Sequence, residues 1–302
     1  MNLLSTSDLR LLQGIPLVTD QSGAALSAYR GGGNLDCVLL PQSEAHLERI
    51  ARLLQKGVPY TLIGNASNTL IADRGVHRLA IVTKQLRGVE ANGTLISAAA
   101  GESLPRLAAF ALKHGLGGME ALSGIPATLG GALKMNAGAF GSEIGDLIED
   151  VTVLDLSDGS CHTMDKTALK FDYRSSSNCF DDKLIVSARL RLHEEHPGVI
   201  EANQRRAIDL RFNTQPRQPS LGSTFRKAEG IGAGYYIDRA GLKGVAVGGA
   251  MVSPKHAGFI VNTGGGTADD YLMLADKIRT AVYRIFKITL VPEFIYEGGE
   301  YT

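Results

Sequence analysis

The chain has 302 residues, enough for two or three packed units that each bury a core. Its 31 basic and 31 acidic residues balance, and no long basic run occurs, so the composition argues against a nucleic-acid-binding protein. No apolar run reaches the ~18 residues of a membrane span, and the first residues, with Asp8 and Arg10, do not resemble a secretion signal. Because the three cysteines form no CxxC pair, we expect a reduced cytosolic protein with no metal site and no insertion into a membrane.

Hydrophobic periodicity predicts two helices and several strands in the first half of the chain. An amphipathic helix is expected over residues 43–56, with Gly57 just beyond its end, and a second over 102–114, which Gly115 ends. Residues 59–72 are predicted to carry an apolar strand into the segment Gly64–Asn68, and further strand patterns are predicted over residues 79–83 and 94–99. Residues 115–145 are rich in glycine and only weakly periodic, so we expect loops and one short helix there.

The second half of the chain begins with strand patterns over residues 151–156 and 184–192. The polar stretch 193–198 ends in a Pro-Gly turn and is the main candidate for a domain boundary. A helix is expected over residues 199–212 and a final strand over residues 288–296. Strands and helices mix without strict β-α-β alternation, which favours an α+β fold over a doubly wound sheet.

A long helix is predicted over residues 267–287. Thr267 is placed to cap it, and Asp269 and Asp270 fall in its first turn, where the helix dipole favours acidic groups. Its inward stripe is expected to consist of apolar residues at helical spacing: Leu272, Ala275, Ile278, Val282 and Ile285.

Two glycine-containing segments point to a bound ligand. The turn Gly64–Asn68 follows a predicted strand, although taken alone it fits a tight connection between two strands equally well. The loop Gly124–Gly131 combines glycines with a proline, which fixes the backbone but offers little side-chain core, and this is costly in a purely structural loop. The nucleotide motifs GxxxxGK[ST] and GxGxxG do not occur, so a dinucleotide would need a different loop design.

Three separated blocks carry a resemblance to a known family. The first is residues 63–70, Ile-Gly-Asn-Ala-Ser-Asn-Thr-Leu, followed by Asp73-Arg74-Gly75. The second covers residues 124–132 and 135–141, with Tyr173-Arg174-Ser175-Ser176 after it. The third runs from Gly222-Ser223-Thr224-Phe225 through residues 240–244 and 255–259 to Pro292-Glu293. Together and in this order, the blocks resemble the UDP-N-acetylenolpyruvoylglucosamine reductase family, also called the MurB family.

The resemblance implies an α+β fold with a p-cresol-methylhydroxylase-type FAD-binding domain and a C-terminal α+β substrate-binding domain. It implies two FAD-binding subdomains, residues 1–84 and 85–197, and a substrate-binding domain over residues 198–302. The C-terminal strand is expected to return to the first subdomain and to bring Glu293 with it. FAD would be held without a covalent bond, and NADPH would supply the electrons.

The expected cofactor site combines backbone and side-chain donors. Backbone N–H groups near glycines can meet the pyrophosphate of FAD, and Ser67 and Asn68 would add a hydroxyl and an amide. The residues that the resemblance assigns to FAD are Gly64, Asn65, Ala66, Ser67, Asn68, Gly124, Ile125, Thr128, Gly130, Gly131, Asn136, Gly138 and Ile185. The sequence departs from the family pattern where Asn65, Ala66 and Ala127 replace glycines, and alanine adopts a left-handed backbone only at a cost.

The resemblance also implies a reaction: reduction of UDP-N-acetylglucosamine enolpyruvate to UDP-N-acetylmuramate, a step of peptidoglycan precursor synthesis. Hydride addition to the vinyl carbon leaves negative charge beside the substrate carboxylate, so the site needs a fixed cation and a proton donor. Arg174 suits the carboxylate because a guanidinium binds it bidentately, and Ser223 suits the proton transfer. The residues expected to contact the UDP-sugar are Tyr173, Lys227, Lys243 and His256, of which Lys243 would meet the diphosphate.

Glu293 is the third expected catalytic residue. We predict it on the final strand, with the apolar side chains of Val291 and Ile295 on its own face. A carboxyl group in such surroundings should either pair with a cation or have a raised pKa. Pairing with Arg174 and polarising the substrate carboxylate as a protonated acid are both open.

Two other functions fit parts of the sequence. A flavin oxidase or dehydrogenase of the same superfamily would share the FAD-binding domain but lack the pair Ser223 and Glu293. A nucleotide-sugar-binding or sensing protein that has lost its flavin would explain the replacements at Asn65, Ala66 and Ala127. A yellow colour of the purified protein distinguishes a flavoprotein from the sensing protein. The sequence does not determine the oligomeric state, and a monomer is favoured.

Overall fold

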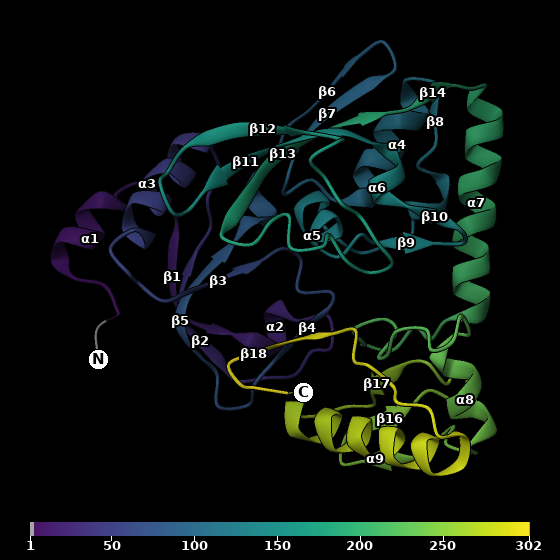
Figure 1. The fold of residues 1–302 in the computed structure, drawn as a ribbon. Coiled ribbons are helices and arrows are strands. Elements are labelled where there is room, and N and C mark those ends of the chain that lie inside the picture. Colours follow the sequence, from purple (N-terminus) through teal and green to yellow (C-terminus); the bar gives the residue numbers. More distant parts are fainter. Residues whose placement is uncertain (1–2, 302) are drawn as a thin grey trace. The chain divides into compact units, whose positions relative to one another are not determined.

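The structure, a computed structural model, describes residues 3–301 and contains two compact units (Figure 1). Unit 1 consists of Met1–Val18, Cys37–Asn65 and Arg78–Arg211, and unit 2 consists of Thr19–Asp36, Ala66–His77 and Phe212–Thr302. Two segments from the N-terminal part of the chain therefore belong with its C-terminal part. The units are described separately below. The three parts expected from the sequence, residues 1–84, 85–197 and 198–302, stay a prediction.

A five-stranded antiparallel sheet is the main β-structure of unit 1 (Figure 1). In sheet order its strands are β12 (Cys161–Asp165), β11 (Ile148–Asp155), β13 (Lys183–Arg191), β7 (Leu95–Ala99) and β6 (Val89–Asn92). On β11, the neighbours Val153 and Leu154 are both buried, and successive strand residues point to opposite faces, so this part of the sheet is covered on both faces. The strands predicted over residues 94–99, 151–156 and 184–192 are confirmed.

Two long helices of unit 1 begin where a serine satisfies the first N–H groups. Ser43 caps α3 (Glu44–Leu54), and Ser103 caps α4 (Leu104–Lys113). Gly57 and Gly115 follow these helices with φ of +82° and +67°, a left-handed geometry that glycine adopts readily. Both predicted helices are confirmed. Unit 1 also contains α1 (Thr6–Leu11), α5 (Leu129–Lys134), α6 (Ile144–Leu147) and most of α7 (Pro197–Thr214).

Residues 115–145 contain short elements joined by loops, as expected from their glycine content. These elements are β8 (Leu116–Gly117), a 3-10 turn at Glu120–Leu122, α5, β9 (Gly138–Ala139) and β10 (Ser142–Glu143). β8 pairs with β14 (His193–Glu194), and β9 pairs with β10.

A further sheet has the strand order β1 (Leu17–Ser22), β2 (Asn34–Leu39), β5 (Val76–Val82) and β3 (Tyr60–Ile63), with a 3-10 turn at Thr83–Gln85 after β5. β3 and β5 are parallel.

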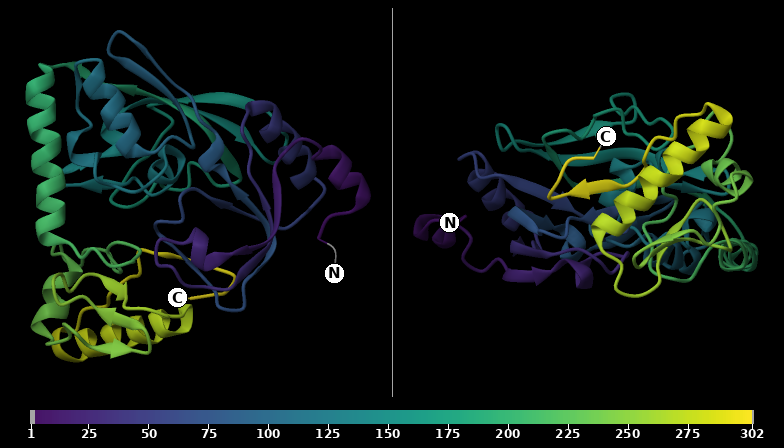
Figure 2. Two further views of the ribbon diagram at one scale, coloured as in Figure 1. Left: turned by 180° about the vertical axis from the view of Figure 1, so that it is seen from behind. Right: turned by 90° about the horizontal axis from the view of Figure 1, so that it is seen from below.

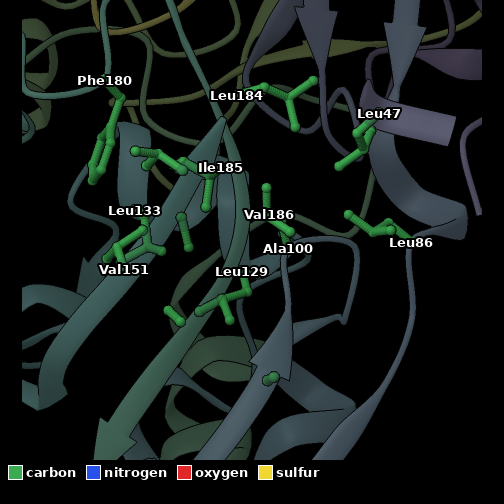
Figure 3. Close-up of a cluster of buried hydrophobic side chains, with 14 of the residues drawn as sticks. Leu47, Leu86, Ala100, Leu129, Leu133, Val151, Phe180, Leu184, Ile185 and Val186 are labelled. Atoms are coloured by element: carbon green, nitrogen blue, oxygen red, sulfur yellow. The ribbon is translucent and has the colours of Figure 1, made fainter. Parts of the chain in front are cut away.

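The core of unit 1 forms between the five-stranded sheet and its helices (Figure 3). Figure 3 shows side chains from α3, α5, β11 and β13 that gather in one cluster: Leu47, Leu129, Leu133, Val151, Leu184, Ile185 and Val186. Burial of such side chains is worth about 1.5–3 kcal/mol each, so this cluster is a main source of the stability of unit 1.

Unit 2 is built around α9 (Ala268–Phe286). This helix packs against α8 (Ala233–Arg239) and against the antiparallel sheet of β15 (Ala246–Val247), β16 (Ala250–Val252) and β17 (Ile260–Asn262). Unit 2 also contains α2 (Gly23–Leu26) and the parallel pair β4 (Thr69–Ile71) and β18 (Ile295–Glu297). Figure 2 shows α9 and β18 in yellow. The end of the chain therefore pairs with a segment from its first quarter.

The start of α9 is held by three carboxyl-bearing or hydroxyl side chains. Thr267 and Asp270 form the reciprocal hydrogen bonds of a capping box, so the predicted cap is confirmed. Asp73 accepts hydrogen bonds from the N–H groups of Ala268 at 2.9 Å and Asp269 at 2.8 Å. A carboxylate at this position also interacts favourably with the helix dipole. Asp73 thereby ties the segment Ala66–His77 to the C-terminal part of unit 2.

Two predictions for the C-terminal part were wrong in detail. On α9, Leu272 is half-buried and Ile285 is 50% exposed, whereas Tyr271 and Leu274 are buried. A helix of this length spans roughly 28 Å, but a three-residue strand spans roughly 10 Å, so the short sheet does not cover the last helical turn.

The predicted final strand is also shorter than residues 288–296. Only Ile295–Glu297 form a strand, because Pro292 has no N–H for a ladder and makes an isolated bridge to Phe225 instead.

The ion pair between Asp8 on α1 and Lys56, which follows α3, gives a test of stability against pH. Hydrogen bonds from Lys56 and Ser5 hold the pKa of Asp8 down to about 2. Because the folded pKa lies below the unfolded value, the contribution of Asp8 is complete above pH ~4 and is lost as the pH falls toward 2. We expect Asp8→Asn to lower the melting temperature at pH 7 and to differ less from the wild type below pH 4. The matched control is Glu90→Gln on exposed β6; a pH-independent effect of Asp8→Asn would contradict the assignment.

Candidate active site

The first two residues of the turn after β3, Gly64 and Asn65, lie against the loop Gly124–Gly131 within unit 1. A side chain at Gly64 would collide with the hydroxyl of Thr128, so the close approach of the turn to the Thr128 side chain favours glycine there. Asn65 donates a hydrogen bond from Nδ2 to the carbonyl of Pro126 at 2.9 Å. The two segments that the sequence assigned to FAD therefore meet at Gly64 and Asn65.

The turn also carries unused hydrogen-bond donors. Within residues 3–301, the N–H groups of Asn65, Ala66, Ser67 and Asn68 donate to no protein acceptor. Ala66 has φ +48°, so alanine does occupy the left-handed conformation that was expected to be costly at this position. Successive N–H groups around a left-handed residue form a concave site that suits an anion.

The loop Gly124–Gly131 differs from the turn in this respect. Its N–H groups are largely used within the protein: Ile125 donates to Leu122, Ala127 to Ile125, Leu129 to Glu102, Gly130 to Ala100 and Gly131 to Thr128. Gly130 is a glycine for packing, because an added Cβ would lie 3.1 Å from the Cβ of Ala100. The expected contacts of this loop with FAD, through Gly124, Ile125, Thr128, Gly130 and Gly131, thus rest on its shape rather than on free donors.

Asn136 joins three segments near Arg174. Its buried amide donates to Glu143 Oε2 at 2.6 Å and to the carbonyl of Asp172 at 2.9 Å, and its Oδ1 accepts from the N–H of Gly145 at 3.1 Å. These bonds use both amide hydrogens. A contact of the Asn136 side chain with FAD stays a prediction, but its structural role in holding this region is clear.

Arg174 is the predicted carboxylate-binding residue, and it lies in a tight turn with φ +53°. Its Nη2 donates to the carbonyl of Gly138 at 2.8 Å, and its guanidinium carbon lies 5.3 Å from the ring centre of Tyr173. Asp172 and Ser175 close the turn through paired backbone hydrogen bonds. These contacts position the guanidinium before a substrate arrives.

Ile185 lies on β13, opposite Val153 on β11, and its side chain belongs to the core cluster of unit 1 (Figure 3). Its assignment to the flavin site stays a prediction.

Unit 2 carries Ser223 on a turn. Gly222 before it has φ +80°, a conformation that favours glycine. The Ser223 side chain is exposed, and within residues 3–301 its hydroxyl has no hydrogen-bond partner. The hydroxyl is therefore available to a ligand.

Ser223 and Glu293 are held close to each other through their neighbours. The N–H of Glu293 donates to the carbonyl of Thr224 at 2.9 Å, and the N–H of Arg226 donates to the carbonyl of Val291 at 2.9 Å. Asn68 donates from Nδ2 to the Glu293 carbonyl at 2.9 Å, and its own carbonyl accepts from Ile295. The structure thus brings Asn68, Ser223 and Glu293, which are far apart in sequence, into one region of unit 2.

The expected surroundings of Glu293 were wrong. Glu293 lies outside the final strand, and the flanking Val291 and Ile295 are 52% and 39% exposed. The irregular backbone around Pro292 turns these apolar side chains outward. The argument for a raised pKa from apolar neighbours therefore does not apply.

The four predicted substrate residues divide between the units: Tyr173 is in unit 1, and Lys227, Lys243 and His256 are in unit 2. Lys227 and Lys243 are exposed. Lys243 Nζ lies 2.7 Å from Asp238 Oδ2, a partner that the sequence did not predict. Burial, and then the charge of Lys243, hold the pKa of His256 below its usual value, so its ring is neutral at neutral pH.

The sequence also missed the structural roles of Asp73 and Thr224. Both residues stand inside blocks that carried the resemblance, so their positions were visible. Their hydrogen-bond partners were not, because Ala268, Ile260 and Tyr271 lie far along the chain.

Comparisons with known proteins identify the family. An enzyme of Caldanaerobacter subterraneus subsp. tengcongensis, UDP-N-acetylenolpyruvoylglucosamine reductase, is 39% identical over 274 residues that cover 90% of each chain. This chain belongs to the UDP-N-acetylenolpyruvoylglucosamine reductase family. A reductase of the same name from Listeria innocua is 38% identical over 283 residues, covering 92% of this chain and 95% of the relative.

Domain and structure comparisons agree with this membership. The C-terminal domain model of the UDP-N-acetylenolpyruvoylglucosamine reductase family matches residues 215–296, and an FAD-binding domain model matches residues 35–165. The crystal structure of the family member from Thermus caldophilus superposes with a TM-score of 0.80 at 32% identity, covering 94% of this chain and 98% of the other.

These findings confirm the predicted fold class, a p-cresol-methylhydroxylase-type FAD-binding domain joined to a C-terminal α+β domain. The protein is an enzyme, a flavin-dependent oxidoreductase. The alternative of a sensing protein without flavin is therefore not supported. No helix within residues 3–301 is both long enough and apolar enough to cross a membrane.

The three hydrogen bonds of Asn136 predict a large effect on stability. At about 1 kcal/mol each, their loss in Asn136→Ala should lower the free energy of unfolding by roughly 3 kcal/mol. The measurement is urea unfolding of the flavin-free protein. Asn92→Ala, on the exposed end of β6, serves as the control and should have almost no effect. Equal stability of the two variants would show that Asn136 does not hold this region.

Proposed function

We propose that this enzyme reduces the enolpyruvyl group of UDP-N-acetylglucosamine enolpyruvate to give UDP-N-acetylmuramate, in peptidoglycan precursor synthesis. Electrons come from NADPH and pass through FAD that is bound without a covalent link. The observation that carries this proposal is the exposed, unpartnered hydroxyl of Ser223 beside Glu293, in a chain that matches named reductases over most of its length. An oxidase of the same superfamily would have no use for a proton donor at this position.

The residues of the turn Gly64–Asn68 fit the pyrophosphate of FAD. Its unused N–H groups around the left-handed Ala66 offer donors to an anion, and Gly64 keeps the turn against Thr128. A covalent link has no candidate here, because residues 64–68 and 124–141 contain neither histidine nor cysteine. When bound, FAD supplies the hydride that this chain cannot supply.

Arg174 and Ser223 act on the substrate. The guanidinium of Arg174 binds the substrate carboxylate and stabilises the negative charge that develops next to it. Ser223 Oγ donates a proton to the carbon that bears this carboxylate. Because the Ser223 side chain is exposed, solvent can return the proton to it. A serine hydroxyl is a weak acid, so this step works because a carbanion is a strong base.

Glu293 acts on the same carboxylate or pairs with Arg174. Substitution by glutamine separates the two roles, since an amide still donates a hydrogen bond but carries no charge.

Lys243 binds the diphosphate of the UDP-sugar, with Tyr173, Lys227 and His256 as further contacts. Its ammonium group is held by Asp238 in the free protein, so the diphosphate competes with this carboxylate. His256 is neutral and can donate or accept a hydrogen bond without adding charge.

The role of Ser223 predicts a difference between the two half-reactions. In Ser223→Ala, NADPH should reduce the flavin at close to the normal rate, because no carbon is protonated in that step. Reoxidation by the enolpyruvyl substrate should be slowed by about 10²–10⁴-fold, as for a lost proton donor. Rapid-mixing absorbance of the flavin measures both rates. Ser223→Cys should recover part of the loss; an alanine variant slowed equally in both half-reactions would make Ser223 a structural turn residue.

The ion pair of Lys243 predicts opposite effects of its two members. Lys243→Ala should weaken UDP-sugar binding by about ten- to a hundredfold, the effect of losing a charged hydrogen bond. Asp238→Asn should strengthen it by about two- to fivefold, because a competing surface ion pair is removed. Titration calorimetry measures both affinities, with the exposed Lys277→Ala on α9 as the control. Weaker binding in Asp238→Asn would show that Asp238 positions Lys243 rather than competing for it.

A further inference from the structure

Among the residues that the structure describes, Arg211 is a partly desolvated cation without a counter-ion. It lies on α7 at the end of unit 1 and is half-buried. Within residues 3–301, its guanidinium makes no hydrogen bond and no ion pair. Burial lowers the pKa of Arg211 from its usual value. By contrast, Arg189 and Arg191 in the same unit pair with Asp150 and Glu149.

Such an arrangement is unfavourable for the protein alone. A charge taken partly out of water without a partner lowers stability, and arginine stays protonated because its pKa is so high. The arrangement becomes favourable when a bound molecule brings a negative charge to the guanidinium.

The position of Arg211 indicates which bound molecule could bring this negative charge. An added Cβ at Gly124 would lie 3.0 Å from Arg211 Cδ and 3.9 Å from Nε, so the arginine side chain runs along the first residue of the loop Gly124–Gly131. That loop meets the turn Gly64–Asn68 through Gly64 and Asn65. Arg211 therefore lies beside the loop Gly124–Gly131, one of the two segments assigned to FAD.

The helix that carries this side chain is held in place. In α7, Ile200 is buried, and Gln204 Nε2 donates to the carbonyl of Ala108 on α4 at 2.9 Å. These contacts fix the helix in unit 1, two to three turns before Arg211.

We infer that Arg211 binds FAD and supplies a positive charge to an anionic part of the cofactor. This inference rests on the proposed FAD site. FAD offers negative charge from two sources, the pyrophosphate and the N1–C2 carbonyl region of the reduced flavin. Arg211 lies outside residues 35–165, which match the FAD-binding domain model, so it would be a contact from α7 that this model does not include.

The first test compares stability with and without FAD. Arg211→Met keeps an apolar stem over Gly124 and removes the charge. Without FAD the variant should melt at the same or a higher temperature than the wild type, because an unpaired charge is gone. With saturating FAD it should melt at a lower temperature. The control is Arg205→Met on the same helix, whose exposed guanidinium pairs with Glu201; it should show neither effect.

The second test measures FAD affinity and the flavin midpoint potential in the same variants. Contact with the pyrophosphate predicts FAD binding about ten- to a hundredfold weaker in Arg211→Met, with the potential unchanged. Contact with the N1–C2 region predicts weaker binding of reduced flavin only, and each tenfold loss lowers the potential by about 30 mV. Arg211→Lys should keep part of either effect.

One result overturns the inference. If Arg211→Met binds FAD as tightly as Arg205→Met, has the same potential and loses stability equally with and without FAD, then Arg211 only packs on Gly124. That outcome would leave the proposed reaction untouched. Conversely, an effect on FAD binding in a protein that fails to reduce the enolpyruvyl substrate would overturn the reaction and keep the inference.

Discussion

A single buried residue, Thr224, holds together the region of unit 2 that contains Ser223 and Glu293. Its Oγ1 accepts hydrogen bonds from the N–H of Ile260 and the hydroxyl of Tyr271, both at 3.2 Å, and its carbonyl accepts from Glu293. Burial raises the pKa of Tyr271 above its usual range, so its hydroxyl is protonated and a donor at neutral pH. Because Thr224 is fixed, the position of Ser223 is fixed up to the rotation of its own side chain. A weak acid such as a serine hydroxyl needs this positioning, since proximity must compensate for its low acidity.

The sequence predicted the regular elements well where local signals suffice. The helix after Ser43 and the long helix after Thr267 were found because caps and apolar periodicity act within a few residues. The failures have a different cause. The exposure of Ile285 depends on the length of the sheet beneath α9. The short length of the final strand depends on how Pro292 pairs with Phe225. The length of the sheet beneath α9 is not contained in the helix segment, and the pairing partner of Pro292 is not contained in the strand segment.

The candidate site was predictable as a set of residue types but not as a geometry. The blocks around Gly64, Arg174 and Ser223 mark the chemistry, since glycine, arginine and serine are the types that the reaction needs. The ion pair of Lys243 with Asp238 and the isolation of Arg211 could not be predicted, because each depends on which side chains the fold leaves nearby. The partners of charged residues near a site can therefore be assigned only from the structure, even when the sequence motifs of the site are easily recognised.

The interleaving of the two units has a consequence for how the chain matures on the ribosome. Tyr29 packs edge-on against Tyr271, with ring centres 5.1 Å apart, and β4 pairs with β18 at the other end of the chain. During synthesis, residues 19–36 and 66–77 emerge long before these partners exist. Unit 1 can bury its own core once residue 211 has been made, whereas the early segments of unit 2 must wait without a core of their own. All residues of unit 1 are therefore made before unit 2 can form, and the β4–β18 pair of unit 2 forms only after β18 has been made.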